Sequence, residues 1–139
     1  MISFNSCLSG FILNNPEKYK TWLHKIIEKA HNKIVGEIVF VFTSDEALHD
    51  INLSHLNHDT YTDIITFSTS IKESIISGEI YISIDRVKEN AQNSNSDYTQ
   101  ELARVMVHGV LHLIGFNDGS DNEMAIMRSQ EDYCLNLLP

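Results

Sequence analysis

The chain has 139 residues, of which 42% are hydrophobic, and its 19 acidic and 10 basic residues give a net charge of −9. A chain of this length supports one globular domain, because two domains would each have a marginal core. The acidic balance excludes a protein that binds nucleic acid through bulk positive charge.

Cysteine use and the N-terminal residues bear on the cellular compartment. Cys7 and Cys134 have no metal-binding or redox spacing, so we expect both to be buried thiols in a reducing compartment. The first fifteen residues lack a basic segment before an apolar one, and no run reaches membrane-spanning length. We therefore expect a single domain over residues 1–139, in the cytoplasm and without a membrane partner.

The first predicted elements are a short strand over residues 2–5 and a helix from Glu17 to about Lys33, capped by Asn15 and started by Pro16. One face of this helix is apolar and the other is basic, with Trp22 at the margin. A charged stripe on a helix is normally a solvated face. The alternative is contact with RNA phosphates beside an aromatic side chain. The residues of this lysine stripe are Lys18, Lys25, Lys29 and Lys33.

The middle of the chain alternates strands and helices. Residues 37–43 are apolar on both faces, which is typical of a central strand. Ser44 can cap a helix that reaches about His55. Strands are predicted at residues 64–68 and 78–84, followed by a helix over about residues 85–92.

A helix from about Asp97 to Ile114, capped by Asp97 or Ser96, is apolar almost all round, so we expect it to be buried. Its few polar side chains form one stripe, and Gly115 can end the helix. A capping box at residues 120–123 opens the last helix, with Met124 and Met127 expected in the core. The polar stripe of the buried helix consists of Glu101, Arg104, His108 and His112.

The histidine pair predicts a metal site on this buried helix. His108 and His112 are four residues apart and so share a helix face. Asp118 follows Gly115, so a returning loop can offer its carboxylate as a third ligand, although Asp121 is close enough to compete. Three such ligands with an open fourth position are typical of catalytic zinc. Buried imidazoles without partners would be costly, which favours a metal.

The spacing H-x-x-x-H-x-x-G-x-x-D has the outline of the metzincin proteases, which use H-E-x-x-H-x-x-G-x-x-H. In this chain Gly109 occupies the position of the protease's general-base Glu, and glycine cannot transfer a proton. A metalloprotease-like hydrolase is therefore an alternative that requires a different base.

Residues 108–116, with the sequence H-G-V-L-H-L-I-G-F, resemble the signature H-G-x-L-H-L-x-G-[YF]-D-H of the YbeY family of bacterial rRNA-maturation endoribonucleases. Residues 62–67 are similar to the family's P-T-D-V-L-S-F segment and residues 78–82 to its G-D-I-x-I strand. Asn52 and Asp59 fall where the intervening loop keeps similar residues. The likeness covers nearly the whole chain.

This resemblance implies an α+β fold, a single domain in which a small mixed sheet of about four strands is flanked by helices. It implies an endoribonuclease with one Zn²⁺ ion, hydrolysing single-stranded rRNA of the small ribosomal subunit in 3′ end maturation and ribosome quality control. Because a free protein with a net charge of −9 is repelled by RNA, we also expect it to act while docked on the ribosome or on a ribosome-associated protein. The ion is expected to polarise a phosphoryl oxygen and to lower the pKa of a bound water to about 7. A non-catalytic, zinc-containing ribosome assembly factor is the second alternative.

The chain departs from the family pattern at two functional positions. Asp118 stands where the family has a third histidine, which makes the site more anionic. Leu56 stands where the family has a loop arginine for RNA binding or cleavage, so that role is either absent here or taken by another cation, Arg104 or the lysine stripe.

The sequence does not settle which groups act as general acid and general base. Glu101 is one candidate, and metal-bound hydroxide and the RNA 2′-hydroxyl are the others. Glu101 could instead be a partner of Arg104 or of a ligand histidine.

Overall fold

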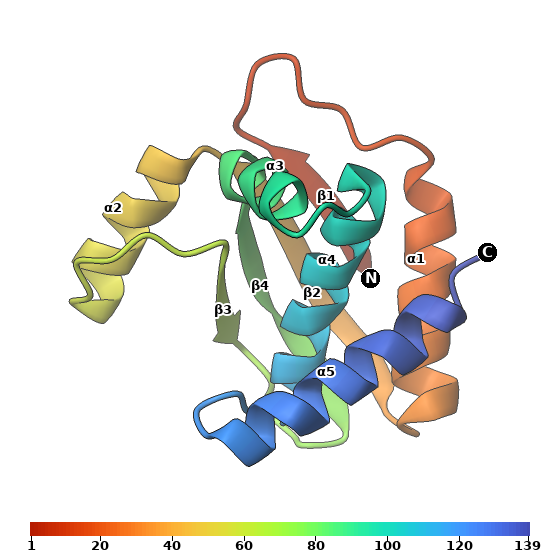
Figure 1. The fold of residues 1–139 in the computed structure, drawn as a ribbon. Helices are drawn as coiled ribbons and strands as arrows, with labels where there is room; N and C mark the ends of the chain where they lie inside the picture. The colour runs from red at the N-terminus through yellow and green to blue at the C-terminus, as the bar shows by residue number, and fades with distance from the viewer.

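The computed structural model describes all residues from Met1 to Pro139. Its four-stranded sheet has the order β1-β2-β4-β3, and helices pack around it (Figure 1). The predicted α+β class with a small mixed sheet of about four strands is therefore confirmed. The strands are β1 (Ile2–Ser6), β2 (Ile34–Thr43), β3 (Ile64–Ser68) and β4 (Ile75–Ser83). The helices are α1 (Pro16–Lys25), η1 (Ile26–Ala30), α2 (Asp45–Leu56), α3 (Ile84–Asn93), α4 (Tyr98–Ile114) and α5 (Asp121–Asn136).

The sheet is mixed because β3 alone runs antiparallel to its neighbour β4, whereas β1, β2 and β4 are parallel. Alternate residues of a strand point to opposite faces, and the two faces differ in burial. Phe40 pairs with Ile80 on the fully buried face, while Glu79 on the other face is exposed. Helix α4 lies across the sheet in Figure 1 and packs against β3 and β4.

Gly109 sets how closely α4 approaches the sheet. A Cβ atom added there would lie 2.8 Å from Ile80 Cγ2 and 2.9 Å from Ile64 Cδ1, closer than van der Waals contact permits. This glycine therefore has a packing role of its own. The helix turn that carries His108 and His112 is held directly against β3 and β4.

The first helix is shorter than predicted. After Lys25 it becomes the single π-helical turn η1, and Asn32 then takes a left-handed conformation with φ 54°. Asparagine tolerates that conformation better than most residues. Strand β2 begins at Ile34, whose N–H donates to Ser74 O.

Two strands begin earlier than their sequence pattern indicates. Strand β2 starts at Ile34 and β4 at Ile75, with a shift of pairing register between Val35 and Ile38. The Oγ of Ser77 accepts from Glu37 N at 3.1 Å within this irregularity. A bulge of this kind breaks the alternation on which strand prediction depends.

Two residues expected in the core are exposed. Cys7 lies at the surface beyond the end of β1, whereas Cys134 is buried as expected. Met127 is buried but Met124 is 55% exposed, because the buried face of α5 begins only at Met127. None of the helices has the length and apolar character needed to cross a membrane.

We expect Gly109→Ala to lower the free energy of unfolding by about 1–3 kcal/mol, because the added methyl group overpacks the contact with Ile80. Alanine favours a helix over glycine by about 1 kcal/mol, so a loss would show that packing decides. Denaturant unfolding measures the change. The control is Gly119→Ala, whose Cβ would meet only Glu123 Oε1 at 3.5 Å. Equal stability of the two variants would contradict the packing role.

Candidate metal centre

The ends of α4 form as the sequence predicts. The carboxylate of Asp97 accepts from Gln100 N at 3.2 Å at the start of the helix. At the other end Gly115 has φ 127°, and its N–H donates to Leu111 O and His112 O at 3.1 Å each. The chain therefore turns sharply one turn after the second histidine and returns along the same side of the helix.

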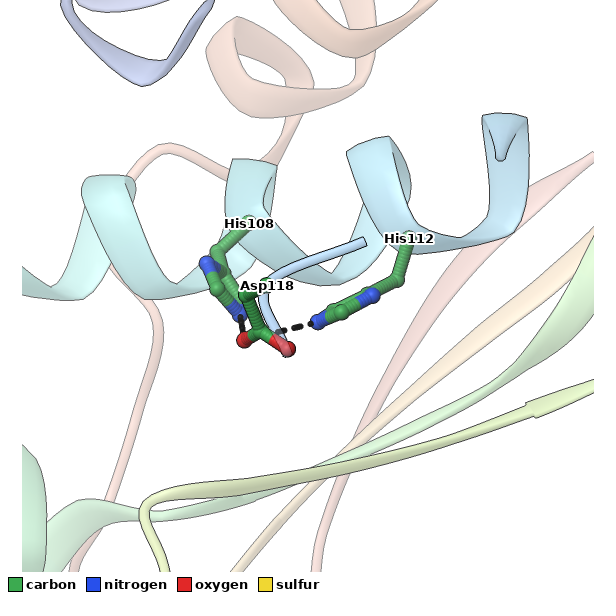
Figure 2. A group of neighbouring side chains, drawn as sticks. All are labelled: His108, His112 and Asp118. Atoms are coloured by element: carbon green, nitrogen blue, oxygen red, sulfur yellow. Dashed lines mark hydrogen bonds and ion pairs between the residues drawn. The ribbon is translucent and has the colours of Figure 1, made fainter. Parts of the chain in front are cut away.

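This return brings Asp118 to the histidines, and the three side chains converge in Figure 2. Asp118 Oδ2 lies 3.3 Å from His108 Nε2 and 3.2 Å from His112 Nε2, and one ligand atom from each residue falls within 4.8 Å of the others. Tetrahedral zinc with bonds of about 2.0–2.2 Å separates its ligand atoms by roughly 3.3–3.6 Å. Nitrogen and carboxylate donors at this spacing fit one ion. Asp121, at the start of α5, is outside this group.

His108 is oriented by a buried carboxylate from the last helix. Its Nδ1 lies 2.6 Å from Oε2 of Glu131, whose side chain is only 6% exposed. Because Nδ1–H donates to that carboxylate, Nε2 keeps its lone pair for a metal. Burial opposes the charged form of His108, but the hydrogen bond and charge of Glu131 outweigh it and raise the histidine pKa.

The other oxygen of Glu131, Oε1, accepts from Arg104 Nη1 at 2.8 Å, and Arg104 Nη2 donates to Asp132 Oδ1 at 2.7 Å. Burial acts to raise the pKa of Glu131, yet the hydrogen bonds from His108 and Arg104 hold it below its ordinary value. A single carboxylate therefore ties two polar residues of α4, Arg104 and His108, to α5.

The sequence analysis missed Glu131 and considered Glu101 for these contacts. Glu101 makes no hydrogen bond to Arg104 or to the ligand histidines. The missed signal is that Glu131 stands in the apolar stripe of α5, four residues after the buried Met127. A lone acidic residue in such a stripe needs a partner.

The two histidines and Asp118 open into a cavity of about 450 Å³. Glu101 and Arg104 line it too, so the structure brings the predicted catalytic residues to the predicted ligands. Burial raises the pKa of Glu101 and also that of Asp63, a second acidic residue of the wall. The full lining is Thr62, Asp63, Ile64, Thr66, Glu101, Arg104, Val105, His108, His112, Asp118, Arg128 and Glu131.

The lysine stripe lies elsewhere. None of its four residues lines the cavity, and Lys25 and Lys29 line a separate surface hollow together with Glu17 and Glu28. Trp22 is only 2% exposed and donates its Nε1–H to Cys134 O at 2.8 Å, so it does not supply the aromatic side chain that the alternative of RNA contact requires. Leu56 ends α2 and does not line the cavity either.

A histidine pair and a carboxylate on a small α+β fold, with one imidazole fixed by a buried acid, form a site typical of metal-dependent hydrolases. The family model described as endoribonuclease YbeY matches residues 11–139. The chain belongs to the endoribonuclease YbeY family, which confirms the resemblance and the predicted enzyme class. This membership disfavours both the metalloprotease and the non-catalytic alternatives.

Relatives that carry this family name are similar in sequence to this protein over most of the chain. Endoribonuclease YbeY of Christiangramia forsetii is 47% identical over 124 residues, which are 89% of this chain and 85% of the relative. The protein of the same name from Flavobacterium psychrophilum is 45% identical and is matched over 99% of this chain and 96% of its own. The solution structure of TM1509 from Thermotoga maritima superposes with a TM-score of 0.68 at 24% identity, covering 99% and 89% of the two chains, and shows the same fold.

We expect Glu131→Gln to weaken binding of a divalent metal ion about 10- to 100-fold, because the amide is a poorer acceptor for His108 and no longer holds its tautomer. Competition with a chromogenic chelator measures the affinity. The matched control is Asp132→Asn, which disturbs only the outer contact of Arg104. Similar affinities for the two variants would show that Glu131 does not orient the ligand.

Proposed function

We propose that the protein is a metal-dependent endoribonuclease of rRNA processing, with one Zn²⁺ ion held by His108, His112 and Asp118. The observation that supports this most is the convergence of three ligand atoms within 4.8 Å, in a chain of the endoribonuclease YbeY family. Two imidazoles and one carboxylate are a ligand set that suits zinc.

The chain's own residues divide the remaining work. When bound, the ion supplies a Lewis acid for a phosphoryl oxygen and a water molecule of lowered pKa. His108 presents Nε2 because Glu131 holds its other nitrogen. Asp118, in place of a neutral histidine, reduces the positive charge of the loaded centre, so additional cations must stabilise the phosphate.

Proton transfer needs a group other than Gly109. Glu101 and Asp63 line the cavity, and burial raises the pKa of each carboxyl, which brings it closer to the working range of a general acid or base. We propose these two as the groups that take and return the proton. Products ending in a 2′,3′-cyclic phosphate would instead identify the RNA 2′-hydroxyl as the nucleophile.

The substrate that we propose is single-stranded rRNA of the small ribosomal subunit, cut in 3′ end maturation and ribosome quality control in the cytoplasm. The net charge of −9 supports a docked mode of action, because a free protein of this charge is repelled by RNA. A ribosomal surface or a ribosome-associated protein would then hold the enzyme on its substrate.

Removal of either His112 or Asp118 from the proposed ligand set should reduce both zinc binding and RNA cleavage. We expect His112→Ala and Asp118→Ala to fall from one zinc per chain to a small fraction of that, and to lose RNA cleavage by at least about 100-fold, because two remaining ligands bind zinc weakly. Metal analysis of the purified protein and cleavage of a labelled single-stranded RNA measure the two effects.

The matched control for Asp118 is Asp121→Asn, an acidic residue three positions later that stands outside the ligand group. It should keep full zinc. Full zinc in Asp118→Ala would remove Asp118 from the ligand set, and zinc-loaded wild-type protein that cuts neither naked nor ribosomal RNA would contradict the endoribonuclease.

Cleavage should depend on the context of the RNA. We expect the same rRNA segment to be cut at least about 10-fold faster in small subunits than as naked RNA at matched salt, because docking removes the electrostatic penalty of the acidic chain. Initial rates on both substrates, each measured across a salt series, test this. Equal rates at low salt would contradict the docked mode.

A further inference from the structure

Two arginines line the metal cavity, and they differ in how far their charges are already compensated. The side chain of Arg104 is 17% exposed, and its two terminal nitrogens are bound to Glu131 and Asp132 at 2.8 and 2.7 Å. An arginine whose guanidinium is occupied by two carboxylates has little capacity left for a phosphate. Arg104 therefore acts mainly as a structural link between α4 and α5.

Arg128 is in the opposite situation. Its side chain is 66% exposed, and its one ion pair is a contact of 3.6 Å from Nη1 to Glu131 Oε1, an oxygen that already accepts from Arg104. The guanidinium makes no hydrogen bond within the protein. Arg128 thus presents an uncommitted planar donor group at the rim of the cavity that holds the three metal ligands.

The negative charge of the cavity wall means that binding of a phosphate there requires an additional cation. Four carboxylates line the cavity, and they face two arginines, of which one is compensated. A bound divalent ion offsets part of this negative charge, but a phosphodiester adds more beside it. Leu56 supplies no cation, and the lysine stripe is not on the wall. The four carboxylates belong to Asp63, Glu101, Asp118 and Glu131.

A second hollow continues beyond Arg128. Its volume is about 320 Å³, and Glu101 and Arg128 line both hollows, so these two residues form the shared wall. The rest of its lining is Asn90, Asn93 and Ser94, at the C-terminal end of α3. The side-chain amides of both asparagines make no hydrogen bond within the protein. Free amides of this kind suit base edges and ribose hydroxyl groups.

We propose that Arg128 binds a backbone phosphate next to the scissile one, and that the RNA strand continues from the metal centre across Arg128 into the hollow lined by Asn90 and Asn93. The proposal rests on the endoribonuclease function proposed above and assigns the path of its substrate. Arg128 is then a substrate-binding residue. It takes the place of the cation that the loop lacks at Leu56.

The kinetic test compares Arg128→Gln with Arg128→Lys and with Lys72→Gln. Lys72 is an exposed lysine of the β3–β4 turn that lines neither hollow. On zinc-loaded protein and a short single-stranded RNA, Arg128→Gln should raise KM about 10-fold or more with kcat within about threefold, because a contact made equally in ground and transition states affects binding alone. Arg128→Lys should recover most of the loss, and Lys72→Gln should match wild type.

Two further readouts separate a phosphate contact from a structural role. The slope of log(kcat/KM) against log[salt] should become shallower by about 0.7 in Arg128→Gln, the value for one phosphate on a single strand. Substrates shortened one nucleotide at a time from either end should locate the contact. The kcat/KM values of wild type and Arg128→Gln should become equal once the phosphate bound by Arg128 is removed from the substrate.

A binding experiment keeps this test independent of cleavage. Fluorescence anisotropy with a 2′-O-methyl oligoribonucleotide, which resists cleavage, should show the same loss for Arg128→Gln and the same recovery for Arg128→Lys. The inference would be overturned if Arg128→Gln gave the same kinetics and the same RNA affinity as Lys72→Gln. It would also be overturned if Arg128→Gln lost zinc or thermal stability. Failure of the wild type to cut RNA would count against the proposed function, while the anisotropy would still decide the role of Arg128.

Discussion

The site depends on one buried carboxylate. Glu131 accepts from His108 through one oxygen and from Arg104 through the other, so it joins the metal-binding helix to the last helix and fixes the imidazole at the same time. Removing either partner would leave part of the buried negative charge of Glu131 uncompensated. The contacts of Glu131 to His108 and to Arg104 therefore depend on each other. The loop that carries Asp118 is held at both ends. Gly115 terminates α4, and the capping box of Ser120 and Glu123, with both hydrogen bonds at 3.1 Å, starts α5.

Packing and chemistry agree at Gly109. In a metzincin the corresponding position carries the general base, but here it lies against the sheet, where even a methyl group would come within 2.8 Å of Ile80. A Glu side chain at this position would have to displace β4. The site therefore lacks a general base at the position that the proteases use, and the acidic side chains of the cavity wall are the candidate protein groups for proton transfer. Glu101 and Asp63 are the acidic side chains of that wall which neither belong to the candidate ligand set nor hydrogen-bond to His108.

Local rules predict part of this structure from the sequence, and long-range contacts decide the rest. The cap at Asp97, the end of α4 at Gly115 and the shared face of the histidines depend only on neighbouring residues, and all three are as expected. The bond between His108 and Glu131 spans 23 residues and depends on how α5 packs. The bulge in β2 and the burial of Trp22 likewise follow from tertiary pairing, which periodicity in one segment does not encode.

The difference between net charge and local charge explains how so acidic a chain can act on RNA. Net charge governs the approach of a distant polyanion, whereas the contact itself depends on charges within a few ångströms. In the cavity of the candidate metal centre, the ion that we propose and Arg128, whose guanidinium makes no hydrogen bond within the protein, would face an RNA backbone. The position of Arg128, one turn before Glu131 on α5, is set by the same helix that orients His108. The proposed contacts to the metal and to the phosphate therefore both depend on α5, so a shift of this helix would disturb both together.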